Sequence, residues 1–254
     1  MFYRILKINV SMVLFIATLV ISFGGALGVT QASVNANTQR LLPIYSVETS
    51  EKKISITFDA AWDSTDTNEL IEILKKHNAK ATFFCVGDWV DKNKEAVKAF
   101  YDNGHEIGNH SDSHADFSKV SEEKVKSEIE NCNKKIGDIT GKTPILCRAP
   151  SGAYDNKSVA ICESLGMKMI QWDVDSLDWK KLSADEMFSR VTNNIQNGSI
   201  VLFHNGVENT PEALDKILTK LKADGYEFVT VRELIYWDNY KIDHTGKQIL
   251  IRSR

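Results

Sequence analysis

Between residues 53 and 230 the chain alternates short apolar runs with longer amphipathic segments. The short runs predict buried strands, and near-helical spacing of apolar residues in the longer segments predicts helices. Strands separated by helices predict an α/β fold with a parallel sheet. About seven such units favour a distorted (β/α) barrel with about seven parallel strands. The predicted strands are 54–58, 81–86, 105–108, 145–147, 167–172, 199–203 and 226–230, and the predicted helices are 66–77, 94–101, 121–139, 157–165, 183–194 and 211–223.

The composition is that of a globular protein and limits the classes of partner. With 254 residues, 43% of them hydrophobic and 26% charged, the chain is long enough for one barrel-sized domain. The formal net charge is −3 and no basic stripe is present, so nucleic acid is not an expected partner. The chain is expected to be a monomer. The expected division is 1–36 as an export segment, 37–52 as a linker or first short strand, 53–238 as the main domain and 239–254 as a peripheral tail.

The N-terminus has the pattern of an export segment. Arg4 and Lys7 precede an uncharged apolar run over 8–30, and Val34, Asn35 and Ala36 offer a small-residue cleavage site. The alternative is an uncleaved anchor, because the run approaches the ~20 residues that span a bilayer. Either alternative places the main domain outside the cell, extracellular or anchored to the outer face of the membrane. Contact with the membrane is expected only through this segment.

Four cysteines are present, and none forms a C-x-x-C pair, so a zinc ribbon or a thioredoxin-like site is not indicated. Cys85 lies in an apolar run where a small hydrophobic side chain fits. We expect Cys85, Cys132, Cys147 and Cys162 to be buried structural thiols. A Cys132–Cys162 disulfide is an open alternative in an exported protein.

His110 and His114 are spaced i, i+4, which places two imidazoles on one face of a helical turn, where both can reach one metal ion. Asp59 ends an earlier predicted strand, so its carboxylate can face the same ion. The alternative is two hydrogen-bonded histidines near a loop. Together the three residues indicate a metal-assisted hydrolase.

Five polar clusters lie at the ends of predicted strands or just after them. Each has a simpler explanation alone: Arg148 could pair with a surface acid, Asp175 and Asp178 could cap a helix, and Trp179 could pack in the core. In a barrel, however, the carboxyl ends of the strands meet on one face, so the joint occurrence indicates a single site. The clusters are Asp59, His110 with His114, Arg148–Tyr154, Asp175–Trp179 and Leu202–His204.

These clusters resemble the motifs of the polysaccharide deacetylase family, the NodB-homology domain of carbohydrate esterase family 4, and are similar to its sporulation and peptidoglycan types. Thr57-Phe58-Asp59 resembles the first motif and 110–114 the second. Arg148-x-Pro150 with Gly152 and Tyr154 resembles the third, Asp178-Trp179 the fourth, and Leu202-x-His204 the fifth. The resemblance covers about 53–234, so it implies that 53–238 is a deacetylase domain with the family's (β/α) barrel.

The resemblance implies that Asp59 is a general base, which is plausible because a carboxylate is ionised at neutral pH. It implies that His110 and His114 hold a divalent metal, expected to be Zn²⁺, which polarises the N-acetyl carbonyl. His204 is then the general acid that protonates the leaving amine. Asp178 is the carboxylate partner that favours its cationic form.

Four further roles follow from the same resemblance. Arg148 orients Asp59 and keeps its pKa low. Trp179 and Leu202 line the pocket for the acetyl methyl or the sugar ring. A backbone N–H near Tyr154 helps to stabilise the oxyanion.

One position departs from the family pattern. The family usually has a second aspartate after the base, which completes an Asp-His-His metal site, and here that residue is Ala60. Alanine cannot coordinate a metal, so weaker binding is expected. Water, Asp59 itself, Asp63 or Asp66 are candidate replacements.

The sequence thus predicts an exported, metal-dependent polysaccharide N-deacetylase, a hydrolase of amide bonds in an N-acetylated glycan. Peptidoglycan is the expected substrate, by resemblance of the export segment to those of Gram-positive cell-wall and sporulation enzymes. One alternative is a chitooligosaccharide deacetylase, and another is a glycan-binding pseudoenzyme that has lost its metal with the change at Ala60. A glycosidase with two carboxylates would not explain the histidine pair.

Overall fold

The computed structural model describes residues 40–251, of which Leu41 onward form one compact unit. The predicted export segment and its cleavage site lie outside the described residues. Within 40–251, no helix has the length and apolarity needed to cross a membrane. The predicted division into linker, main domain and tail stays a prediction.

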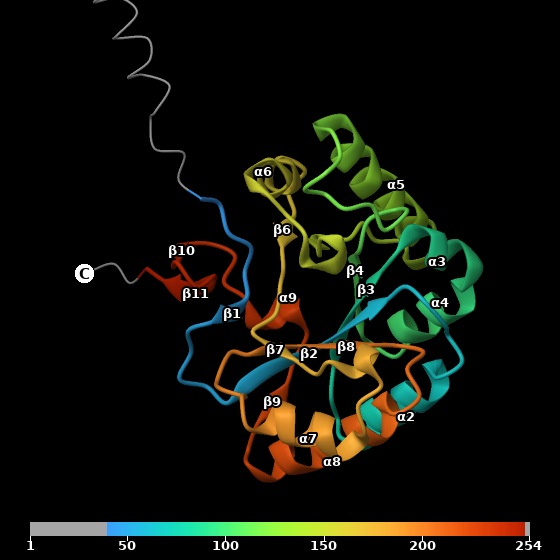
Figure 1. The fold of residues 1–254 in the computed structure, drawn as a ribbon, viewed down its shortest axis with the longest axis vertical. Coiled ribbons are helices and arrows are strands. Elements are labelled where there is room, and N and C mark those ends of the chain that lie inside the picture. The colour runs from blue at the N-terminus through green and yellow to red at the C-terminus, as the bar shows by residue number, and fades with distance from the viewer. Residues whose placement is uncertain (1–39, 252–254) are drawn as a thin grey trace, which may run out of the picture. The chain divides into compact units, whose positions relative to one another are not determined.

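A parallel sheet forms the centre of the domain, with helices arranged around it (Figure 1). Its strands follow the order β6-β5-β4-β3-β2-β8-β7, and β9 pairs with the start of β2. Every pairing in this sheet is parallel, so the predicted α/β barrel with about seven parallel strands is confirmed. The strands are β2 (Lys53–Ala60), β3 (Ala81–Cys85), β4 (Glu106–Asn109), β5 (Leu146–Cys147), β6 (Lys168–Met169), β7 (Val174–Asp175), β8 (Ile200–His204) and β9 (Glu227–Phe228).

The helices form where apolar residues recur at helical spacing, and they bury that face against the sheet. Several begin at side-chain caps: Ser121 accepts from the Lys124 N–H, and Ser183 forms a capping box with Glu186. The helices are α2 (Thr67–Lys76), α3 (Gly87–Lys92), α4 (Lys94–Asp102), α5 (Glu122–Thr140), α6 (Asn156–Ser164), α7 (Ala184–Thr192), α8 (Thr210–Ala223) and α9 (Val231–Leu234), with short 3₁₀ turns at Pro150–Gly152 and Asp178–Lys180.

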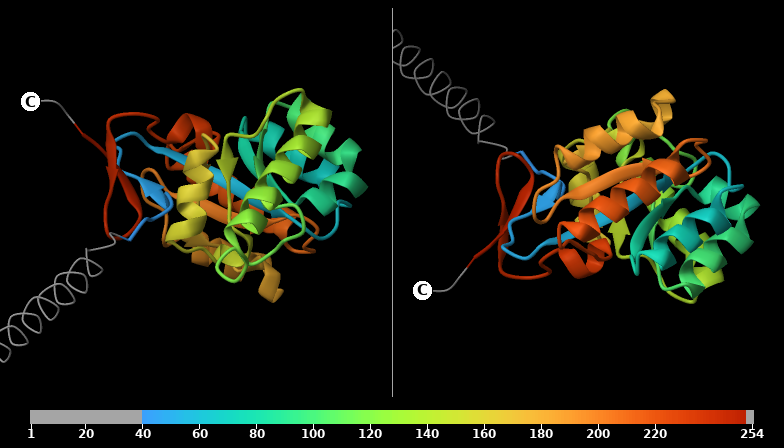
Figure 2. Two further views of the ribbon diagram at one scale, coloured as in Figure 1. Left: turned by 90° about the horizontal axis from the view of Figure 1, so that it is seen from above. Right: turned by 90° about the horizontal axis from the view of Figure 1, so that it is seen from below.

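A second sheet joins the two ends of the described chain. Strands β1 (Ser46–Val47), β10 (Tyr240–Ile242) and β11 (Lys247–Leu250) lie in the order β1-β11-β10, and both views of Figure 2 show β10 and β11 beside the β1 segment. The β1 segment also bridges the main sheet, through Ile44 to Ile170 and through Ser46 to Ser199. Residues predicted as a linker and a tail therefore pack onto the domain.

The core under the central strands is built on stacked aromatic rings. The Phe83 ring lies 4.8 Å from that of Phe58 and 3.7 Å from that of Phe100, and all three side chains are fully buried. This packing fixes β2 and β3, and with them the residues at their carboxyl ends. All four cysteines are buried, as predicted, and they are free thiols, so the Cys132–Cys162 disulfide is not formed.

Candidate active site

The carboxyl ends of β2 and β8 lie side by side, because these strands pair in parallel with Asp59 opposite His204. A cavity of about 400 Å³ lies at these strand ends. It draws residues from all five predicted clusters, so the structure brings the clusters to one place. Its lining consists of Asp59, Ala61, Trp62, His110, His114, Ser151, Trp172, Asp175, Trp179, Leu202 and His204.

Asp59 is paired with a buried arginine. Arg148 follows β5, is fully buried, and donates from Nη1 to Asp59 Oδ1 at 2.7 Å and from Nη2 to the Gln171 carbonyl at 3.1 Å. Its guanidinium also lies 4.1 Å from the Phe84 ring centroid. Burial raises the pKa of Asp59, but its interactions with His110 and with the Arg148 guanidinium outweigh that effect and leave the pKa below its usual value. Asp59 is therefore an ionised acceptor at neutral pH.

His110 and His114 do not share a helical turn, so the predicted local structure is wrong. They lie on the loop after β4, in which Ser111 and His114 have positive φ values of 66° and 59°. Backbone of this shape turns the chain sharply and needs support from its surroundings. The two rings nevertheless meet edge to face, with centroids 5.1 Å apart. The loop brings the imidazoles together by a different route from the one the spacing predicted.

Glu128 of α5 supports this loop and was missed at the sequence level. Its carboxylate is 1% exposed and accepts hydrogen bonds from the N–H groups of Asp112 and Ser113 and from the Ser113 hydroxyl. Burial alone would raise the pKa of Glu128. The hydrogen bonds from Lys124 and Ser113 outweigh that effect and lower the pKa to about 2. The sequence offered one sign of this role: Glu128 is a charged residue on the apolar face of the amphipathic helix α5.

The histidine pair provides two of the donors that a metal needs. His110 Nδ1 lies 2.9 Å from the Arg148 carbonyl, which leaves Nε2 facing Asp59 Oδ2 at 3.3 Å. A carbonyl on one ring nitrogen is the usual support of a metal-binding imidazole. Burial lowers the pKa of His110 to about 4, so the ring is neutral, as a ligand must be. The donor set thus fits a divalent ion held by His110 and His114.

A third protein donor is not in place. Ala60 is fully buried in the main core cluster, and within residues 40–251 no group of three or more His, Cys, Asp or Glu side chains is arranged to hold a metal. Asp63 Oδ1 accepts from the Ser64 and Thr65 N–H groups, while Asp66 accepts from the Gly206 N–H. Neither carboxylate lines the cavity, so neither compensates for Ala60.

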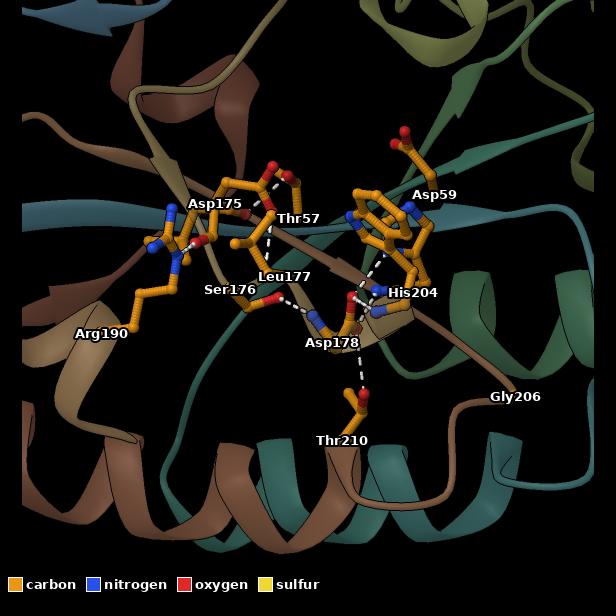
Figure 3. A network of polar contacts seen from close by, with 12 residues as sticks. Thr57, Asp59, Asp175, Ser176, Leu177, Asp178, Arg190, His204, Gly206 and Thr210 are labelled. Carbon is orange, nitrogen blue, oxygen red and sulfur yellow. Dashed lines mark hydrogen bonds and ion pairs between the residues drawn. The ribbon is translucent and has the colours of Figure 1, made fainter. Parts of the chain in front are cut away.

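His204 and Asp178 form the second charged pair, shown in Figure 3. His204 Nδ1 lies 2.7 Å from Asp178 Oδ1, and the His204 N–H donates to Oδ2 at 2.6 Å. The Thr210 hydroxyl donates to the same Oδ2 at 2.9 Å. Burial lowers the pKa of His204, but the hydrogen bond to Asp178 and the charge of Asp59 outweigh it and raise the pKa above the usual value. The histidine can therefore stay cationic beside a fully buried carboxylate.

Two of the three residues predicted to bind substrate line the cavity, and the third does not. Trp179 and Leu202 line the cavity. The Tyr154 side chain does not line it, and its hydroxyl lies 3.0 Å from that of Tyr45 in the segment before β1. Ser151 lines the cavity from the same loop, with a positive φ of 54°. Trp62 also lines it, and sequence reasoning did not select it.

Comparison with known proteins bears on the family of this chain. The family model for polysaccharide deacetylase matches residues 46–170. A peptidoglycan-N-acetylglucosamine deacetylase of Bacillus cereus is 37% identical over 75% of this chain and 92% of its own length. One of Listeria monocytogenes is 42% identical over 78% of this chain, which spans only 41% of that relative.

A solved structure adds a contrast. A family 4 carbohydrate esterase pseudoenzyme of Bacillus anthracis superposes with a TM-score of 0.73 at 36% identity, over 76% of this chain and 68% of that one. A mutant of the same protein, described as having restored enzymatic activity, matches with the same TM-score at 37% identity. On these matches, the chain belongs to the polysaccharide deacetylase family.

Proposed function

We propose that this chain is an exported, metal-dependent N-deacetylase that removes acetyl groups from amino sugars of peptidoglycan. The observation that carries the proposal is the pair of buried charge partners at one cavity. Asp59 is held ionised by Arg148, and Asp178 raises the pKa of His204 on the adjacent strand and so favours its cationic form. A base and an acid of this kind are what amide hydrolysis needs, whereas a protein that only binds glycan has no use for them.

Asp59 would accept the proton of the attacking water, since its charge is fixed before the substrate arrives. His204 would donate a proton to the amine nitrogen as the C–N bond breaks, and Asp178 would keep the ring oriented during the transfer. A divalent ion at His110 and His114, expected to be Zn²⁺, would supply Lewis-acid polarisation of the acetyl carbonyl. Leu202 and Trp179 would enclose the acetyl methyl or the sugar ring.

Two observations support the substrate and the location. The relatives named above are described as acting on N-acetylglucosamine in peptidoglycan, and one of Bacillus subtilis, 31% identical over 79% of its length, on N-acetylmuramic acid. The apolar N-terminal run with its basic flank fits an export signal or an anchor. We therefore place the domain at the cell wall.

Acetate release from peptidoglycan and from N-acetylglucosamine oligomers, with and without a chelator, tests the proposal. We expect release from peptidoglycan that stops on chelation and returns with zinc. Release from the oligomers alone would favour the chitooligosaccharide alternative. No release from any glycan at saturating zinc would contradict the proposed function.

The second candidate is a glycan-binding pseudoenzyme, and Ala60 is the observation that favours it. The donor set is one carboxylate short, and a pseudoenzyme of the same family superposes well on this chain. Under this alternative the cavity binds the glycan and the charged pairs only maintain its shape.

Ala60→Asp should tighten zinc binding by about tenfold or more, because the family pattern has a metal-binding aspartate at this position, which would add an anionic oxygen to the two-histidine site. Ala60 is fully buried, so the new carboxylate is costly unless a cation offsets its charge. The melting temperature of the variant should therefore rise more on adding zinc than that of the wild type. Ala60→Asn is the matched control, since an asparagine side chain has nearly the same size as that of aspartate but carries no charge. Equal zinc affinity in Ala60→Asp and wild type would mean that another group already fills the position.

Asp178→Asn should move the alkaline limb of the pH profile of kcat/KM to lower pH. The hydrogen bond and charge of Asp178 raise the pKa of His204, so the wild-type acid stays protonated at higher pH than an ordinary histidine. A neutral amide removes the charge, and burial then lowers that pKa. The measurement uses saturating zinc, so that metal loss does not shape the profile. An unmoved alkaline limb would separate Asp178 from the acid function.

A further inference from the structure

Trp62 is a large apolar side chain that the fold leaves open to solvent at the cavity. It is 55% exposed, and its ring is stacked on that of His204, with centroids 4.9 Å apart and planes 19° apart. Of the large hydrophobic side chains in residues 40–251, four are exposed, and two of these, Trp62 and Trp179, line the same cavity. An indole this exposed contributes little to the core, so stability alone does not explain it.

The backbone around Trp62 is fixed to the strand that carries His204. The Asn205 side-chain N–H donates to the Asp63 carbonyl at 2.5 Å, and the Gly206 N–H donates to Asp66 Oδ2 at 2.7 Å. Gly206 has a φ of 73°, and a Cβ there would lie 2.7 Å from Asp63, so glycine permits this close approach. The loop after β2 is therefore attached to the residues that directly follow His204.

Both exposed indoles are thus built onto the acid pair. Trp62 covers one face of the His204 ring, while Trp179 follows Asp178 and donates its N–H to Asp178 Oδ1 at 2.8 Å. Trp179 is 49% exposed. A pyranose ring in the chair form presents a face of C–H groups that packs against an aromatic surface, while its hydroxyl groups stay in water. Exposed aromatic side chains beside the reacting groups are suited to hold such a ring.

We propose that Trp62 binds the sugar ring of the substrate with the indole face that does not contact His204, so that the acetamide group of an N-acetylhexosamine reaches past the indole into the cavity. The class of ligand rests on the proposed function, but the residue and its contact go beyond it. The stacking also restricts His204. Because the indole covers one face of the imidazole, the ring cannot swing toward that side when the sugar binds.

Binding of an N-acetylglucosamine tetrasaccharide, measured by calorimetry, tests the proposal. All proteins carry Asp59→Asn, so that turnover does not consume the ligand. Trp62→Ala should weaken binding by about tenfold, the scale of a lost aromatic contact. Trp62→Tyr should stay within about threefold of the parent because it keeps an aromatic face. Trp237→Phe is the control, because Trp237 is a tryptophan that does not line the cavity.

The outcomes separate this proposal from the proposed function. Equal affinity of Trp62→Ala and the parent, or no binding by the parent, would overturn the role of Trp62. Loss of binding in Trp62→Ala with rescue in Trp62→Tyr supports it even if the wild type releases no acetate, in which case only the deacetylase assignment fails. Circular dichroism of each variant shows whether the fold is kept. If Trp62→Ala is unfolded, Trp62→Leu takes its place and should show the same loss.

Discussion

Asp59→Asn should lower kcat by about 10²–10⁴, the scale of a positioned general base. The amide keeps nearly the same shape and can still accept the hydrogen bond from Arg148 Nη1, which the carboxylate accepts at 2.7 Å in the wild type. It cannot take up the proton of the attacking water. The fold should therefore survive while turnover is lost. Acetate release under single-turnover conditions measures the loss directly.

His204→Ala is the companion variant, with an expected loss of similar size. His204 lies on β8, whereas His110 and His114 lie on the loop after β4, so zinc content should be unchanged when His204 is removed. Metal analysis of the purified variant checks this point. Loss of zinc from His204→Ala would show that His204 is a ligand and that the roles of acid and ligand have been confused.

Arg148→Met should reduce the free energy of unfolding by about 3–5 kcal/mol, because it leaves a buried carboxylate without its partner. Arg148 is fully buried and Asp59 is 5% exposed, so solvent compensates only partly for the lost contact. Without the guanidinium, burial raises the pKa of Asp59 above its unfolded value of about 3.9. In the wild type, by contrast, the pKa of Asp59 lies below its unfolded value. The loss should thus be small at strongly acidic pH and grow as the pH rises from the lowered folded pKa of the wild type to the raised folded pKa of the variant.

Two further variants make this result specific. Arg190→Met removes an exposed arginine that donates to the Asp175 carbonyl, and it should cost less than about 1 kcal/mol. The double variant Arg148→Met, Asp59→Leu removes both charges and should recover much of the stability. Urea unfolding at several pH values gives these numbers. A pH-independent deficit in Arg148→Met would mean that lost packing against Phe84 and Trp172, and not the unpaired charge, is the cause.

The fold followed from local pattern because most strands are short apolar runs between amphipathic helices. The same pattern could not resolve 167–172, which was predicted as one strand. The chain ends β6 at Met169, and β7 begins at Val174 on the opposite edge of the sheet. Strand pairing is a long-range property that a local window does not contain. The brief helix α3 was missed because six residues are too few to show a helical period.

The site was predictable where chemistry depends on residue type and order, and less so where it depends on backbone shape. Asp59 and His204 were placed at strand ends, and those strands proved to be neighbours. The loop at His114 could not be foreseen, because positive φ at non-glycine residues is imposed by surrounding contacts such as those of Glu128. The contact between Trp62 and His204 could not be predicted from local sequence, because it exists only after β2 and β8 pair.

The pairing of β2 with β8 joins segments that are far apart in the sequence. Asp59 lies near the start of the domain and His204 near its end, with most of the helices and strands between them. Contacts between segments so distant in sequence form slowly, because a long loop must close before they stabilise the chain. A chain in which β8 has not yet docked therefore lacks His204 beside Asp59, so we expect the proposed acid and base to come together only when β2 and β8 pair.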